Sequence, residues 1–80
     1  MNNDIDIINN KKVQDIILWH RIGCISVILA KQLDVSPTRA MQIFYDSEVY
    51  DRFVDKSSML YIFNDYYIAD EVIISLKINK

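Results

Sequence analysis

The stretch LAKQLDVSPTRAMQIF, residues 29–44, contains the sharpest break between two helical segments in this chain. Ser36 is a natural helix N-cap, and Pro37 suits the first position of a helix. Asp34 tolerates the left-handed backbone that a tight turn requires. We therefore expect one helix to end just before this turn and a second helix to run from Pro37 to about Asp46.

The segment upstream of the turn predicts a long first helix. From about Lys12 to Leu33 it contains no proline and one glycine. At 100° per residue, its apolar side chains fall on two faces. The first face carries Val13, Ile16, Ile17, Cys24, Val27 and Ile28, and the second carries Leu18, Ile22, Ile25, Leu29 and Leu33. Because both faces are apolar, we expect this helix to be covered on both sides, by its own domain or by a partner chain.

Two further helices are expected downstream. Ser47 can cap a short third helix, and Asn64 or Asp65 can cap a last helix through residue 77. The segment LYIF, residues 60–63, is compatible with an extended strand or a helical turn. The terminal VIISLKI, residues 72–78, is rich in β-branched residues and is compatible with a strand. The side chains expected in the core of these elements are Ala40, Met41, Ile43, Phe44, Val49, Tyr50, Phe53, Val54, Tyr67, Ile68, Ala69, Val72, Ile73 and Leu76.

Length and composition limit the chain to one small domain. It has 80 residues, of which 51% are hydrophobic, with one glycine and one proline. We predict an all-α fold over residues 11–80: a small bundle of about four helices, with a long first helix, a helix-turn-helix-like corner, a short third helix and a C-terminal helix. Residues 1–10 are expected to form a flexible N-terminal arm.

Charge and cysteine content exclude several classes of protein. The net charge is −2 and no Lys or Arg cluster is present, which disfavours binding to nucleic acid. The single cysteine, Cys24, rules out an internal disulfide and suits a reducing compartment. Asp15, His20 and Arg21 interrupt the apolar run of residues 13–30, which argues against a membrane span. We expect a cytoplasmic protein.

No catalytic, cofactor or metal site is predicted. His20 is the single histidine, and Cys24 one turn away is its only soft neighbour, whereas a zinc site takes about four ligands. A thiol among isoleucines and valines is typical of a buried, unreactive cysteine. The acids of residues 46–55 lack the spacing of a calcium loop. We therefore expect a protein that is not an enzyme.

The corner also has the spacing of a helix-turn-helix motif. DNA recognition would use the polar side chains of its second helix, Thr38, Arg39 and Gln42. The acids Asp46 and Glu48 follow directly, and a corner used only for packing has the same spacing. A dimeric DNA-binding regulator is therefore the alternative function.

The second half of the chain is aromatic and acidic. Residues 43–72 hold all five tyrosines and all three phenylalanines, together with seven acids and two bases. Tyrosines next to acids are typical of surfaces that bind other proteins. The partner-binding candidates are Tyr45, Tyr61, Tyr66, Glu48 and Asp51. The leading prediction is a protein–protein interaction module that binds another protein or a second copy of itself.

The blocks FYDSEVYDRF and LYIFNDYYIADEV resemble a family of short bacterial proteins catalogued as a domain of unknown function. Members share an F-Y-x-S-x-x-Y block and an N/S-D-x-Y-[apolar]-x-[D/E]-E-[apolar] block, and the resemblance covers residues 16–75. Their genes often lie beside one that resembles ADP-ribosyltransferase toxins, which implies an antitoxin-like or accessory partner. Relatives often carry His near the position of Tyr61, where this chain departs. The matching positions are Phe44, Tyr45, Ser47, Tyr50, Asn64, Asp65, Tyr67 and Glu71.

Overall fold

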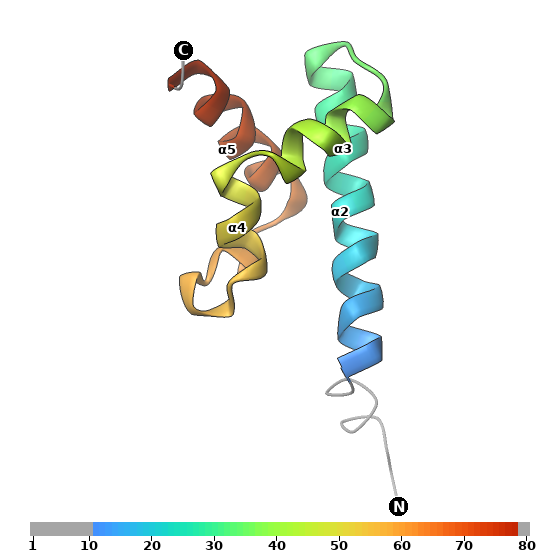
Figure 1. Cartoon of the computed structure of the whole chain (residues 1–80), viewed down its shortest axis with the longest axis vertical. Helices are drawn as coiled ribbons and strands as arrows, with labels where there is room; N and C mark the ends of the chain where they lie inside the picture. Colours follow the sequence, from blue (N-terminus) through green and yellow to red (C-terminus); the bar gives the residue numbers. More distant parts are fainter. Residues whose placement is uncertain (1–10, 79–80) are drawn as a thin grey trace, which may run out of the picture.

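The computed structural model describes residues 11–78, and this part of the chain is all-α (Figure 1). Two short 3-10 turns connect the third and last of its α-helices. The elements are α2 (Lys11–Leu33), α3 (Pro37–Tyr45), α4 (Glu48–Val54), η1 (Lys56–Ser58), η2 (Leu60–Ile62) and α5 (Asp65–Ile78). The predicted small bundle of about four helices is thereby confirmed. The predicted arm of residues 1–10 lies outside the described residues.

The corner between α2 and α3 forms as its sequence predicts. Asp34 adopts the left-handed conformation with φ 56°, and the Val35 N–H donates to the Ala30 carbonyl at 3.0 Å, which closes the last turn of α2. The Ser36 hydroxyl accepts the Arg39 N–H at 3.1 Å and caps α3. The chain therefore reverses, and α3 packs across α2 near its C-terminal end (Figure 1).

Side-chain caps also start the two later helices. Ser47 accepts the Tyr50 N–H at 3.2 Å at the start of α4. Asn64, rather than Asp65, caps α5 by accepting the Tyr67 N–H at 2.8 Å. The ambiguous residues 60–63 form the 3-10 turn η2 and its exit, and residues 72–78 are helical rather than a strand.

The core lies where α2, α3, α4 and α5 meet. Phe44 is at its centre, with its ring 5.4 Å from that of Tyr50 and 5.8 Å from that of Phe53. Two serines are also buried, and each hydroxyl donates to a carbonyl one turn back in its own helix, so neither is left unpaired. The buried apolar side chains are Ile22, Ile25, Leu29, Ala30, Ala40, Phe44, Val49, Phe53, Leu60, Ile68, Ala69 and Val72.

Three side chains predicted in the core are exposed instead. Tyr67 is 42% exposed and stacks on Phe63, with ring centroids 4.5 Å apart. Leu76 is exposed because the inward stripe of α5 runs through Ile68, Ala69, Val72 and Ser75. Val54 is exposed because it is the last residue of α4, where the chain turns away. The other predicted core residues are buried or packed against the core.

Candidate functional site

The fold covers one of the two apolar faces of α2 and leaves the other open. On the covered face, Ile22, Ile25 and Leu29 are buried. On the open face, Ile16 is 61% exposed and Val27 is 47% exposed. We call the open side the outer face of α2; it carries Ile16, Ile17, His20, Gly23, Cys24 and Val27. We expected both sides of this helix to be covered, and within residues 11–78 only one side is covered.

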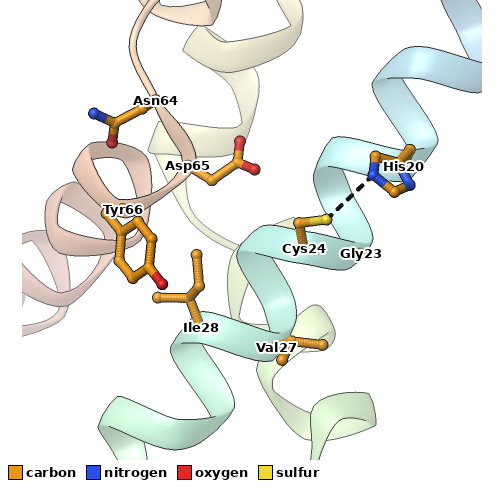
Figure 2. A pocket seen from close by; sticks show the side chains of 8 residues that line it. All are labelled: His20, Gly23, Cys24, Val27, Ile28, Asn64, Asp65 and Tyr66. Atoms are coloured by element: carbon orange, nitrogen blue, oxygen red, sulfur yellow. Dashed lines mark hydrogen bonds between the residues drawn. The ribbon is translucent and has the colours of Figure 1, made fainter.

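An open, mostly apolar groove runs between the outer face of α2 and the start of α5 (Figure 2). Its floor is α2, and Tyr66 stands on the α5 side with its ring directed toward Ile28 (Figure 2). His20 and Cys24 lie at one end, with Nε2 and Sγ 3.5 Å apart. The lining residues are His20, Gly23, Cys24, Val27, Ile28, Asn64, Asp65 and Tyr66.

Gly23 lies on the floor of this groove with open space above it. A Cβ placed on Gly23 would meet no heavy atom from another part of the described chain within 4 Å. Glycine in a helix interior is less favourable than alanine by about 1 kcal/mol. Packing within residues 11–78 therefore gives no reason for a glycine at this position.

Arg21 fixes the position of α5 relative to α2. Its Nε donates to Asp65 Oδ1 at 2.8 Å, and its two Nη atoms donate to the carbonyls of Phe63, at 2.6 Å, and of Tyr61. The guanidinium also lies 5.0 Å from the centroid of the Phe53 ring, in cation–π geometry. This side chain thus holds the turn that leads into α5 and positions the groove wall.

This role of Arg21 is not visible in the sequence, where the residue only interrupts an apolar run. The partners lie 40 to 44 residues away in the chain, and no local pattern pairs positions so far apart. The groove itself had a signal, because the two apolar faces of the first helix predicted a surface that needs cover.

The predicted partner-binding tyrosines are all exposed but are separated. Tyr45 lies at the end of α3, with its ring 4.9 Å from that of Tyr50 in α4. Tyr61 is in η2, and Tyr66 is in the first turn of α5 beside the groove. Among the described residues, no ring contact joins these three side chains.

The predicted acids accompany only one of these tyrosines. Glu48 and Asp51 lie in the first turn of α4, the helix against which Tyr45 rests. Both acids are exposed. Glu48 and Asp51 share α4 with Tyr50, whose ring contacts that of Tyr45, and Tyr66 lies apart from them beside the groove.

The DNA-binding candidates Thr38, Arg39 and Gln42 are exposed on α3. Arg39 is the only base in this nine-residue helix, and Asp46 is its C-cap. The outer surface of α3 therefore offers a single positive charge, Arg39, beside two neutral polar side chains, and DNA binding stays a prediction.

Helix α2 also meets the length and composition of a membrane span. Within Lys12–Leu33, an 18-residue window reaches a mean hydropathy of 1.4, and 28% of that window is buried. Core helices of soluble proteins and signal sequences can meet the same criteria. Insertion of α2 as a span would take Arg21 away from the carbonyls and the carboxylate that it binds.

Comparisons with known proteins do not identify a family for this chain. No protein-family model, curated protein or solved structure matches it. Within residues 11–78, no group of three or more His, Cys, Asp or Glu side chains is placed to hold a metal ion.

Proposed function

We propose that this chain is a non-enzymatic protein–protein interaction module that docks through the outer face of α2. The observation that carries this proposal is the open apolar side of α2, where Ile16, Ile17 and Val27 are about half exposed or more. Burying a large aliphatic side chain is favourable by about 1.5–3 kcal/mol. A patch of such side chains beside a groove is typical of a binding surface.

The shape of the groove favours a helix as the docking element. Amphipathic helices bind in apolar grooves through side chains spaced one helical turn apart. Here the floor follows one long helix, and Tyr66 supplies an aromatic wall with a polar hydroxyl at its tip. Tyrosine is suited to such a rim because its ring is apolar while its hydroxyl remains hydrated.

The exposed residues Tyr45, Glu48 and Asp51, at the end of α3 and the start of α4, are taken as a second docking surface in this proposal. Its acids complement a basic partner, and the Tyr45 ring supplies an anchor. The resemblance to the domain-of-unknown-function family implies an antitoxin-like or accessory role, and a toxin-type protein with a basic groove would suit these acids.

The test is capture of a partner by the tagged chain from extracts of the cells that produce it. Val27→Asp places a charge on the outer face of α2, and Gln32→Asp places the same charge on an exposed position of the same helix outside the groove. We expect Val27→Asp to abolish capture and Gln32→Asp to retain it, with equal helical content by circular dichroism. Capture that survives Val27→Asp, Tyr45→Ala and Tyr66→Ala alike would contradict the proposal.

The alternative function, DNA binding through α3, is supported by the exposure of Thr38, Arg39 and Gln42 on one short helix. A gel shift on DNA upstream of the gene at two salt concentrations tests it, because phosphate contacts weaken as salt rises. A shift that disappears in Arg39→Gln would favour this alternative, and the absence of a shift at low salt would exclude it.

A further inference from the structure

We infer that the outer face of α2 pairs with the outer face of a second copy of this chain, in an antiparallel contact centred on Gly23. This inference rests on the proposed function, since it names the occupant of the same surface. Three observations carry it: the position of Gly23 in α2, the charge of the outer face and the exposed apolar area around it.

Gly23 marks a place of close approach. It lies near the middle of the 23-residue helix α2, which is about 34 Å long. Glycine allows another backbone to come close, and space for such an approach is open above it. A two-fold axis beside Gly23 would overlap the two helices along nearly their whole length. A two-fold contact uses the same patch on both copies, so a patch centred on the helix suits it.

The outer face can lie against itself without electrostatic cost. Its six side chains include no carboxylate, no lysine and no arginine, whereas the chain as a whole has a net charge of −2. Asp65, at the groove wall, is already paired with Arg21 at 2.8 Å. Arg21, the base nearest to Gly23 in α2, is bound to Asp65 and to the carbonyls of Tyr61 and Phe63, and Lys31 would lie at opposite ends of an antiparallel pair. The antiparallel direction also places opposite ends of the helix dipoles together.

The exposed apolar area suits a weak, reversible dimer. At roughly 100 Å² for each half-exposed large side chain, Ile16, Ile17, Val27 and Tyr66 offer on the order of 400 Å², within the range of weak interfaces, which lie below about 600 Å² per partner. A stable interface takes about 800 Å² from each partner. The smaller side chains of the groove floor, Gly23 and Cys24 among them, supply further area because they line the same surface.

The first experiment measures the mass of the purified full chain by sedimentation equilibrium over a wide concentration range. We expect a reversible dimer, and Gly23→Leu should weaken self-association at least tenfold, on the order of what overpacking costs a close contact. The matched control is Gln32→Leu, which adds the same side chain to an exposed position of α2 outside the groove. It should leave the dimer unchanged. Both variants should remain folded, with the helical content of the natural chain by circular dichroism.

The second experiment uses Cys24, the only cysteine in the chain, as a reporter of the contact. An antiparallel contact on the outer face brings the two Cys24 residues to the same contact near the two-fold axis, where motion of a reversible dimer can bring their Cα atoms to the roughly 4.4–6.8 Å that a disulfide spans. Diamide, which takes up the two thiol hydrogens, should therefore link two copies through one disulfide. The Cys24→Ser/Gln32→Cys double variant should remain unlinked under the same conditions.

The outcomes separate this inference from the proposed function. A chain that is monomeric at every concentration, or a dimer that Gly23→Leu leaves intact, would overturn the inference. If that monomer still captures a foreign protein through Val27, the proposed function as an interaction module is supported, and that protein is what binds the outer face of α2. If the monomer captures nothing, both are wrong.

Discussion

Arg21 and Asp65 are 44 residues apart in sequence and are joined by an ion pair, with Arg21 Nη2 and Asp65 Oδ1 2.8 Å apart. The pair ties the middle of α2 to the first turn of α5. The same guanidinium also binds backbone carbonyls of the preceding turn. The position of the groove wall therefore depends on one side chain of the helix that forms the groove floor.

Arg21→Lys should lower the free energy of unfolding by about 1–2 kcal/mol, because an ammonium cannot reproduce the fork of three hydrogen bonds. Asp65→Asn should cost less, since an amide oxygen still accepts from Arg21 and the two carbonyl contacts remain. Urea denaturation measures both changes. Arg52→Lys is the control: this arginine is exposed on α4, and its replacement should change stability by less than about 0.5 kcal/mol. Equal effects of Arg21→Lys and Arg52→Lys would show that the bridge contributes nothing to stability.

Asn64→Ala should destabilise the chain by about 1 kcal/mol, because the Tyr67 N–H at the start of α5 loses its acceptor. The same change should loosen the position of Tyr66 and weaken docking in the groove. Thermal denaturation followed by circular dichroism gives the first effect, and partner or self-association gives the second. Asn64→Ser restores a capping oxygen and should recover most of both losses. A serine variant as unstable as the alanine variant would contradict the capping role.

Met59→Gly should stabilise the chain by about 0.5–1 kcal/mol. Met59 adopts φ 64° between η1 and η2, a left-handed conformation that costs an L-residue about 1–2 kcal/mol and glycine little. Part of this gain is offset by the greater freedom of glycine in the unfolded chain. The side chain is 52% exposed, so little packing is lost. Met59→Ala removes the same side chain but keeps the strain, and it should give no gain in the midpoint of thermal unfolding.

The carboxylate of Asp55 predicts an acid-sensitive contribution to stability. It accepts the Ser57 hydroxyl at 2.7 Å and the Ser57 N–H at 3.0 Å, and these bonds hold its pKa below the ordinary value of 3.8. Because the folded chain binds this proton less readily than the unfolded chain, the contribution is fully present above the unfolded pKa. It is lost as the pH falls through the lower folded pKa.

Urea denaturation of the natural chain and of Asp55→Asn at several pH values from 6 down to about 2 measures this effect. The stability difference between the two proteins should be constant above about pH 5 and shrink as the pH falls below 3.8. A difference that stays the same over the whole range would show that the Ser57 hydrogen bonds do not favour the charged form of Asp55.

The limits of the helices follow from local sequence alone. Ser36, Ser47 and Asn64 cap the helices that they precede, and Asp34 takes the left-handed turn, because a cap or a turn depends on side chains within about three residues of the backbone that they bind. The same reasoning groups the apolar side chains of α2 into two faces, since helical spacing fixes which side chains share a side.

Local sequence does not fix which surfaces meet across the fold. It predicts two apolar faces on α2 but does not show which one the other helices cover. It also predicts Tyr67 in the core, whereas the buried side of α5 carries Ile68, Ala69, Val72 and Ser75 and leaves Tyr67 exposed. Nor does it pair Arg21 with Asp65. These features depend on how segments some 40 residues apart pack together, and that packing is set by the sum of many weak contacts rather than by any one motif. The open face of α2, and with it the proposed function, comes from the tertiary arrangement.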